Sequence, residues 1–529
     1  MSARETTLLS GVVVAGIGAR LYQLGAESLW WDEAASWGLS QLPVHELWSS
    51  VPQYELSPPF YYTLLRIWSF VAGNSEFALR LPSAIFGAMT IPVVYLIGRK
   101  ALLDRREGTW AGLSAALIFA LHPVQIQFAQ NARAYALLTF ACSLVILALV
   151  SWLRDPRALE CLFQRRAHSD DRRWPYAVMF ALGCALALWS HNTAVLLLGS
   201  LVCISIVLIL VRSSDRSLAL RNIVGLGAFA LLLWLPGAFW LIKSVNRVQT
   251  DFWITRPSIH DFVDLCDYLF GSAGLAQPAL NQVFAVAVFG LVAAAGAWRL
   301  ISRGDWPVAV LLCLGAAFPI LVSLGASFLI TPIFISRPLI WTQICAAVLV
   351  GIAILWLPDT GWWRSAGAVA VLACLAAGLT AAYPSRQEPW REIADMIARD
   401  SRPDDLIVVW PSFTHLPMRY YKLNERAKGR RATLWFAEPG DNAYPSLRQM
   451  LTSKELSTED VLREIREKEV AGARVWVVIR VGGKPVSPWN QTTVSMNKYL
   501  ASVRGAPDNR LAATGPARLL LYPERLNDK

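Results

Sequence analysis

Two adjacent carboxylates, Asp32 and Glu33, are the residues of this chain best placed to do chemistry. They follow the first apolar run by a few residues, within the sequence SLWWDEAASW at residues 28–37, and tryptophans flank them. Because tryptophan favours the water–lipid boundary, we expect both carboxylates at a membrane surface, where ionisable groups are costly and mark functional sites. A carboxylate there can deprotonate a hydroxyl group or bind a divalent cation. The structural alternative is that Asp32 is the N-cap of a helix that begins near Ala34.

Basic side chains form a second group of candidates, and we expect their partner to be an anion. Arg133 interrupts an otherwise apolar helical hairpin, and Lys243 and Arg337 stand at the ends of later apolar runs. A guanidinium binds phosphate in a bidentate way, so these cations predict a phosphate site opposite the acidic pair. The alternative is that each cation only extends its charged end to the membrane surface.

Tyrosine, histidine and amide side chains near the same loops are candidates for binding a substrate: Tyr54, Tyr61, Asn131, Tyr135 and His191. Tyrosine suits the membrane interface and also stacks on sugars. His191 and its neighbour Asn192 split one long apolar run into two. Aromatic anchoring and a simple polar turn are the structural alternatives at these positions.

The elements that must position these side chains are membrane helices. Of 529 residues, 55% are hydrophobic and only 16% are charged, whereas a soluble domain would carry more charge. The mean hydropathy is +0.41. About eleven apolar runs approach the ~20 residues that a helix needs to cross the hydrocarbon. They are Thr7–Leu24, Ala78–Gly98, Trp110–Phe128, Tyr135–Leu153, Trp174–Ser190, Thr193–Val211, Ile223–Ile242, Asn281–Leu300, Pro307–Phe328, Pro338–Leu357 and Ser365–Ala382.

A further run, Pro58–Ala72, is short and is either another span or a helix in the interface. The first run has no small-residue cleavage site after it, which predicts a retained anchor and not a cleaved signal. We therefore predict a mostly α fold, a polytopic membrane helical bundle of about 11–13 spans.

Charge in the loops predicts the orientation of the bundle. Arginine and lysine cluster in alternate loops, among them residues 99–106, 154–173 and 212–221. These loops should be cytoplasmic, and the alternation works best if Pro58–Ala72 does not cross. The loop carrying Asp32, the loop near Arg133, the turn at His191 and the C-terminal tail are then all outside. The net charge of +11 is explained by the cytoplasmic loops, so it does not indicate nucleic-acid binding.

A domain boundary is predicted near Tyr383, because polarity rises sharply after it. Residues 389–399 have helical periodicity, 406–410 predict a buried strand, 459–469 a second helix and 475–480 a second strand. This alternation predicts a small C-terminal α/β extracytoplasmic domain over residues 384–529. Residues 1–383 form the predicted transmembrane catalytic domain, with a first external loop at about residues 25–77. The structural alternative is that the tail only stabilises or shields the membrane part.

Four stretches together resemble a known family. They are SLWWDEAASW at 28–37, SPPFYYTLLRIWSFVAGNSEFALRLPSAIFG at 57–87, QFAQNARAYALL at 127–138 and EPWREIADMIA at 388–398. In order and content they resemble glycosyltransferase family 39 and the aminoarabinose-transferase-like group, membrane glycosyltransferases of the GT-C superfamily. The resemblance is most specific in the first ~140 residues. It implies a GT-C fold and a mannosyltransferase-like enzyme of the cell envelope, a hexosyl- or pentosyltransferase that uses a polyprenyl-phosphate sugar.

The resemblance also carries roles onto positions of this chain. Asp32 corresponds to the first-loop acidic residue of the family, and Arg337 to a basic residue that can meet donor phosphate. His191 lies near a polar break that relatives share. Many relatives carry an acidic residue in the second loop, where this chain has Asn131 and Arg133. That departure puts a metal site built from two carboxylates in doubt.

The expected reaction is a single inverting displacement. Asp32, aided by Glu33, deprotonates an acceptor hydroxyl, which attacks the anomeric carbon of the sugar. The lipid phosphate leaves with its charge held by Arg133, Arg337 and Lys243. The expected partners are a polyprenyl-phosphate sugar donor, a glycan, lipid or protein acceptor, and membrane lipids. The sequence points to no particular cofactor, and a divalent cation such as Mg²⁺ or Mn²⁺ stays open.

We expect the protein in the inner membrane of a bacterium, with its site and C-terminal domain on the periplasmic side. Three other functions are open. A transporter or lipid flippase predicts inverted repeats and broken helices at mid-membrane, and the sequence contains no such repeat. A structural role would not explain why the charged candidate residues are predicted on one side of the membrane. An oligosaccharide ligase would use the same kind of site with a larger donor.

Overall fold

The computed structural model describes residues 2–49, 57–163, 173–250, 256–270, 279–355, 388–411, 414–436, 456–470, 472–481, 488–511 and 516–525. The chain divides by compactness into two units. The first comprises residues 1–24, 48–64 and 80–384, and the second comprises residues 25–47, 65–79 and 385–529. Two segments of the predicted first external loop therefore group with the C-terminal part of the chain. Each unit is described by itself.

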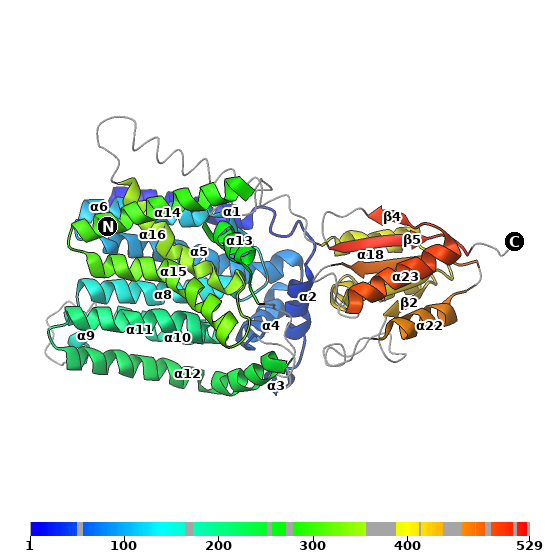
Figure 1. The fold of residues 1–529 in the computed structure, drawn as a ribbon, viewed down its shortest axis with the longest axis horizontal. Helices are drawn as coiled ribbons and strands as arrows, with labels where there is room; N and C mark the ends of the chain where they lie inside the picture. Colours follow the sequence, from blue (N-terminus) through cyan, green and yellow to red (C-terminus); the bar gives the residue numbers. More distant parts are fainter. Residues whose placement is uncertain are drawn as a thin grey trace, which may run out of the picture. The chain divides into compact units, whose positions relative to one another are not determined.

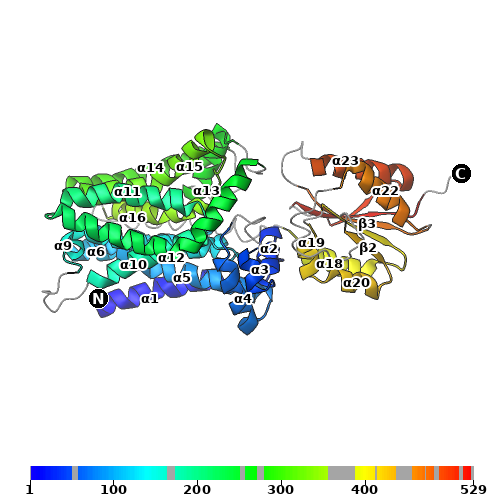
Figure 2. The ribbon, with the colours of Figure 1, turned by 90° about the horizontal axis from the view of Figure 1, so that it is seen from below.

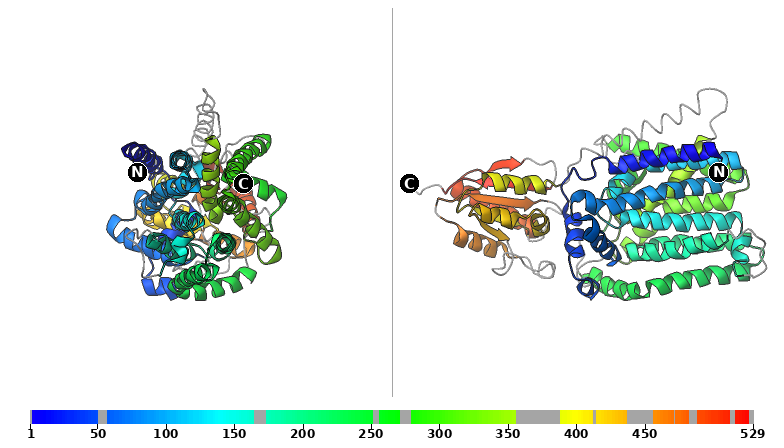
Figure 3. Two further views of the ribbon diagram at one scale, coloured as in Figure 1. Left: turned by 90° about the vertical axis from the view of Figure 1, so that its left-hand side faces the viewer. Right: turned by 180° about the vertical axis from the view of Figure 1, so that it is seen from behind.

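The first unit is built from helices that run side by side (Figures 1 and 3). Their bounds are α1 Ala3–Leu21, α5 Glu76–Ala101, α6 Arg105–Leu121, α7 Pro123–Ala129, α8 Tyr135–Arg154, α9 Arg157–Glu160, α10 Arg173–Ser190, α11 Ala194–Arg212, α12 Arg216–Thr250, α13 Ile259–Phe270, α14 Ala279–Ser302, α15 Trp306–Leu329, the 3-10 helix η2 Arg337–Thr342, and α16 Gln343–Ile354. Helix α8 is buried on all sides because α10, α11 and α15 pack around it.

Six helices in the described part of the chain are long and apolar enough to cross a membrane, and a bent pair, α6 with α7, would be a seventh. The six are α5, α8, α11, α12, α15 and the continuous η2–α16 segment. The chain is thus a multi-pass membrane protein. Helix α1 is not among them, because Arg4, Glu5 and Arg20 lie within its 19 residues. The predicted span Ser365–Ala382 lies outside the described residues.

Helix α4, Phe60–Ala72, occupies the apolar run Pro58–Ala72, for which both a membrane span and an interfacial helix were open. It has 13 residues, which corresponds to about 20 Å of helix against the ~30 Å of a hydrocarbon core. A helix of this length is too short to cross the hydrocarbon by itself. It follows the short helix α3, Val44–Ser49.

A bend between α6 and α7 places the second polar loop. The two helices meet at 59°, and Pro123 occupies the first position of α7, where its missing N–H costs nothing. The break frees backbone carbonyls at the end of α6. One of them, the oxygen of Ala120, accepts a hydrogen bond of 2.8 Å from Nη1 of the fully buried Arg20. The chain then turns through residues 130–134 into α8.

The second unit contains a five-stranded mixed sheet in the order β2-β1-β3-β5-β4. The strands are β1 Leu406–Trp410, β2 Thr433–Phe436, β3 Val475–Arg480, β4 Asp508–Leu511 and β5 Ala517–Tyr522. β1 is parallel to β2 and β3, whereas β5 is antiparallel to β3 and β4. All five residues of β1 are buried, as a central strand covered on both faces requires.

Helices cover both faces of this sheet (Figure 2). One face carries α18 Trp390–Asp400, α19 His415–Tyr420 and α20 Leu423–Gly429, and the other carries α22 Thr458–Lys468 and α23 Pro488–Arg504. The predicted C-terminal α/β domain is confirmed. The helix predicted over residues 389–399 is confirmed as well, and the four residues of its inner face are fully buried: Trp390, Ile393, Ala394 and Ile397.

Candidate functional site

The acidic pair lies on helix α2, Trp31–Ser40, in the second unit. The helix begins at Trp31 and not near Ala34, so Asp32 lies in its first turn, and the expectation that it is the N-cap is wrong. Trp30 is the N-cap residue. Glu33, the third residue of the helix and only 1% exposed, accepts at Oε2 a hydrogen bond of 3.3 Å from the backbone N–H of Trp30. Asp32 is half-buried.

Arg133 lies in a polar and aromatic cluster of the first unit. Its Nη1 donates to the hydroxyl of Tyr62 at 3.2 Å, and its guanidinium lies 5.9 Å from the ring of Tyr135. Ser83 on α5 donates to the backbone oxygen of Arg133 at 3.0 Å, and Oγ of Ser83 lies 2.9 Å from the hydroxyl of Tyr61. Since Ser83 donates to the carbonyl, Tyr61 donates to Ser83. Residues of α4 and α5 thereby hold the second loop in place.

His191 contributes a neutral ring to the same cluster. The ring lies 6.0 Å from that of Tyr135, with 34° between their planes. The backbone N–H of Thr193 points at Nδ1 at 3.3 Å, so Nδ1 accepts and the proton of the neutral ring sits on Nε2. Burial, with the positive charge of Arg133 added, lowers the pKa of His191 to about 4. The ring is therefore a hydrogen-bond donor without charge at neutral pH.

Tyr268 on α13 connects Arg337 with the second loop. Its hydroxyl donates to Oε1 of Gln127 at 2.9 Å, and its ring lies 6.4 Å from that of Phe128, which in turn lies 5.2 Å from Tyr135. Burial raises the pKa of Tyr268, and the nearby charge of Arg337 opposes that rise. Arg337, at the start of η2, thus lies close enough to act electrostatically on the cluster.

Asn131 offers a buried acceptor in the second loop. Asn131 is 6% exposed, and its side-chain Oδ1 has no hydrogen-bond partner among the described residues. A buried acceptor without a partner costs about 1–3 kcal/mol, so such a group is kept where a ligand can supply the donor.

We call this set the cation–aromatic cluster: Tyr61, Tyr62, Ser83, Gln127, Phe128, Asn131, Arg133, Tyr135, His191, Tyr268 and Arg337. Five of its members were selected from the sequence for donor or substrate binding: Tyr61, Asn131, Arg133, Tyr135 and His191. Arg337 is a sixth selected residue, and it is linked to the others through Tyr268. Ser83 and Tyr268 were missed, because a single serine or tyrosine in an apolar helix gives no sequence signal. The predicted Tyr54 and the side chain of Lys243, on α12, lie outside the described residues.

Among the described residues, no group of three histidine, cysteine, aspartate or glutamate side chains could hold a metal ion. Oε2 of Glu33 is occupied by a backbone N–H, which leaves Asp32 as the half-exposed member of the pair. Chemically, the guanidinium group of Arg133 can bind an anion, and the rings and the Asn131 amide can bind a hydroxylated ligand.

Comparison with known proteins identifies the fold. The family model for the protein O-mannosyl-transferase TMEM260 N-terminal domain matches residues 57–216. ArnT from Cupriavidus metallidurans in the apo state has a TM-score of 0.57 at 15% identity, and its structure bound to undecaprenyl phosphate has 0.55 at 14%; both matches cover 98% of each chain.

An Archaeoglobus fulgidus oligosaccharyltransferase in complex with Zn and sulfate has a TM-score of 0.50 at 15% identity. That match covers 89% of this chain and 67% of the archaeal one. No curated protein matches this sequence. The resemblance read from the four motifs is confirmed at the level of the fold: the chain has an ArnT-like architecture, a membrane helical bundle with a small C-terminal α/β domain.

Proposed function

We propose that this chain is a membrane glycosyltransferase that moves a sugar from a polyprenyl-phosphate donor to an acceptor hydroxyl. The observation that carries the proposal is the cation–aromatic cluster, which combines two arginines with rings, a neutral imidazole and a buried amide acceptor. Two further facts support it. ArnT, which shares the fold, is known bound to undecaprenyl phosphate, and the matched family model describes a protein O-mannosyl-transferase.

Arg133 and Arg337 hold the donor phosphate. A guanidinium presents its N–H groups in a planar fork that matches two phosphate oxygens. Tyr62 and Tyr135 fix the direction of Arg133 through the hydrogen bond and the ring contact. Lys243 is retained as a third cation for the same anion.

The sugar lies against Tyr135 and His191. An aromatic face suits the C–H face of a sugar ring, and Nε2–H of His191 donates to a sugar hydroxyl without adding charge. Oδ1 of Asn131 accepts from a second hydroxyl and gains the partner that it lacks. Tyr54 and Tyr61 are kept as further contacts, with Tyr61 acting through Ser83.

Asp32 is the base of a single displacement. It takes the proton of the acceptor hydroxyl while the acceptor oxygen forms a bond to the anomeric carbon and the bond from that carbon to the phosphate oxygen breaks. The configuration inverts, and the electron pair leaves on the lipid phosphate, where the arginines stabilise its charge. Glu33 assists by holding the first turn of α2. This structural role is smaller than the part in deprotonation that was expected from the sequence.

The proposed setting is the inner membrane of a bacterium, with the cluster, α2 and the domain 384–529 on the periplasmic side. The acceptor is a lipid, polysaccharide or protein. Reporter fusions at residue 529 and in the loop around residue 104 test this orientation. Periplasmic signal at residue 529 and cytoplasmic signal at residue 104 support it, and the reverse pattern overturns it.

Substitution of the base tests the reaction. Asp32→Asn should lower kcat by about 10²- to 10⁴-fold, the range for a positioned general base, while donor binding stays near that of the wild type. Asp508→Asn is the matched control, because that carboxylate is exposed and pairs with Arg510 in its own strand. Activity of Asp32→Asn near the wild-type level in purified, reconstituted protein would remove Asp32 from the mechanism.

An oligosaccharide ligase is the second candidate, and the fold shared with the archaeal oligosaccharyltransferase favours it. Competing a polyprenyl-phosphate monosaccharide against a lipid-linked oligosaccharide separates the two. Transfer in detergent, where no compartments exist, also excludes a transporter or flippase as the whole function.

A further inference from the structure

The segment that leads into the acidic helix is held by residues more than 300 positions away. Trp31 is the first residue of α2, and its backbone N–H donates to Oε2 of Glu388 at 2.8 Å. The first four N–H groups of a helix have no partner within it, and a carboxylate at this end also meets the positive end of the dipole. Glu388 is 4% exposed, so the bond is shielded from water.

Glu388 is itself fixed from two sides. Arg480 at the end of β3 donates through Nε to Oε1 at 2.7 Å, and the indole N–H of Trp390 donates to Oε2 at 2.8 Å. Arg480 belongs to the sheet, and Trp390 belongs to α18, the helix packed on it. The position of the first N–H of α2 is therefore set by the core of the C-terminal domain.

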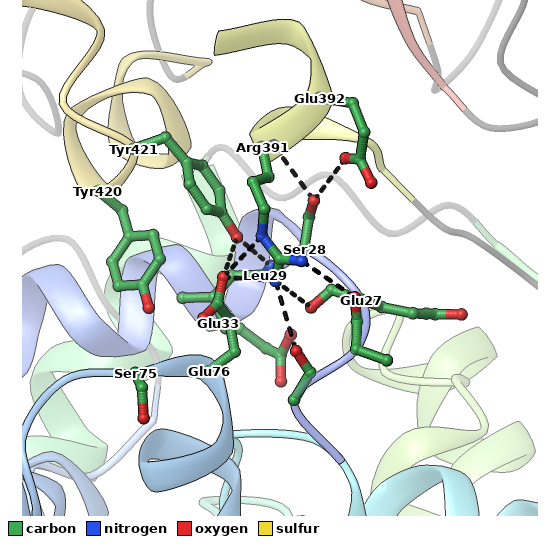
Figure 4. A network of polar contacts seen from close by, with 12 residues as sticks. Glu27, Ser28, Leu29, Glu33, Ser75, Glu76, Arg391, Glu392, Tyr420 and Tyr421 are labelled. Carbon is green, nitrogen blue, oxygen red and sulfur yellow. Dashed lines mark hydrogen bonds and ion pairs between the residues drawn. The ribbon is translucent and has the colours of Figure 1, made fainter. Parts of the chain in front are cut away.

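Arg391 binds the backbone that precedes α2. Its guanidinium donates to three successive carbonyl oxygens, those of Gly25, Ala26 and Glu27, at 3.4, 3.1 and 3.4 Å. Glu76 pairs with the same guanidinium at 2.6 Å and holds it in that orientation. Figure 4 shows Arg391 reaching from its helix towards Glu27 and Glu76.

Tyr421 and the first turns of α18 complete the contacts. The hydroxyl of Tyr421 accepts from the backbone N–H of Leu29 at 2.8 Å and lies 3.1 Å from Oε1 of Glu76 (Figure 4). Ser28 donates to Oε2 of Glu392 at 2.9 Å and accepts from the N–H of Arg391 at 3.1 Å. Each residue from 25 to 31 except Trp30 thus bonds to a residue between 388 and 421, and Trp30 is held by Glu33.

We propose that Glu388, Arg391 and Tyr421 are positioning residues of the transferase, which set the backbone before α2 and with it the direction of the Asp32 carboxylate. The proposal rests on the proposed role of Asp32. It gives the C-terminal domain a part in catalysis beyond shielding, because residues 25–30, which lead from α1 into α2, contain no helix or strand of their own. A displacement of about 1 Å in such a group can cost about 10²-fold in rate.

Hydrogen exchange of the full chain in lipid nanodiscs tests the physical part. Glu388→Gln keeps the size of the side chain but removes the charge that binds Trp31 N–H and Arg480. We expect exchange in peptides covering residues 28–36 to become about tenfold faster. Tyr421→Phe, which deletes one oxygen and leaves the fold intact, should raise exchange at Leu29 in the same direction.

Glu524→Gln is the control, because that exposed carboxylate of the same domain pairs with Arg402 at 3.6 Å, away from residues 28–36 in the sequence. Unchanged exchange over residues 28–36 in both Glu388→Gln and Tyr421→Phe overturns the proposal. Faster exchange throughout the chain overturns it as well, because it would mean general unfolding.

Kinetics tests the catalytic part. Glu388→Gln should lower kcat by about 10- to 100-fold with the KM for the donor unchanged. In the Asp32→Asn background the same substitution should lower kcat no further, because its effect acts through Asp32. Effects that multiply in the double variant would overturn the proposal.

The two failures are distinguishable. If Asp32→Asn is active, the proposed base is wrong whatever the exchange data are. If Asp32→Asn is inactive while Glu388→Gln retains full kcat, the proposed function stands and the positioning role is wrong.

Discussion

The cation–aromatic cluster and the segment 25–31 are built in opposite ways. In the cluster, side chains contact other side chains of the helical bundle, and its centre, Arg133 with Tyr135, comes from one short stretch of sequence. In the segment, backbone groups are bound by side chains from positions 357 to 392 residues later. The proposed anion site therefore depends on the packing of spans, whereas the proposed base depends on a folded C-terminal domain. Perturbing one region should leave the other intact.

The largest expected effect is on the cluster. Arg133→Ala removes the guanidinium that Tyr62 and Tyr135 orient, and it should lower kcat/KM by about 10²- to 10³-fold, as for other preorganised charge-stabilising groups. Arg133→Lys should recover only part of this loss, because an ammonium group lacks the planar fork. Transfer assays in reconstituted membranes measure both.

Exchange over residues 28–36 should be unchanged in Arg133→Ala. A clear rise there would show that the two regions are coupled and would remove the contrast between them. The control is Arg463→Ala on α22, an exposed arginine that pairs with Asp460 and Glu467 of its own helix.

The second effect is on the C-terminal domain. Asp405 is buried and accepts from Nη2 of Arg474 at 2.7 Å and from the indole N–H of Trp476 at 2.9 Å. Asp405→Asn leaves Arg474 without its charge partner and should lower the free energy of unfolding of this domain by about 3 kcal/mol. Thermal denaturation should report that loss, with exchange over residues 28–36 rising in parallel and donor binding retained.

The same carboxyl predicts a dependence on pH. Burial raises its pKa, but the Arg474 side chain, the Arg402 N–H and the Trp476 indole outweigh this, so the pKa is lowered on folding. A lowered pKa means that the stabilisation is complete above the unfolded value, about 3.9, and is lost as the pH falls further.

Donor binding that fails together with the domain in Asp405→Asn would contradict the independence of the two regions.

The smallest effect concerns His191 and pH. With its folded pKa near 4, the ring stays neutral from pH 5 to 8. The pH profile of kcat/KM should therefore contain no step near pH 6.5 that comes from His191, and His191→Gln should leave the shape of the profile near that pH unchanged. Because the unfolded ring takes up a proton near pH 6.5, stability falls as the pH drops from 6.5 towards 4. A step near 6.5 that disappears in His191→Gln would mean that the ring is charged when it acts.

Much of the fold followed from local patterns. Apolar runs predicted the helices of the bundle, and the periodicity of residues 389–399 predicted both α18 and its buried face. Strands β1 and β3 lie where their apolar runs placed them. Strands β2, β4 and β5 were not predicted, because they are short and owe their structure to pairing with neighbours.

Composition and hydrophobic periodicity alone determined that this chain is a multi-pass membrane protein with an α/β tail, since burial of apolar surface depends mainly on residue type and spacing. The same local information selected Asp32, Arg133, Tyr135 and His191 as candidates. Only the tertiary structure decided that α2 begins at Trp31, that Tyr62 contacts Arg133 across 71 residues, and that Glu388 binds the first N–H of α2. A hydrogen bond needs donor and acceptor within about 3 Å, and for groups hundreds of residues apart no local pattern specifies that distance.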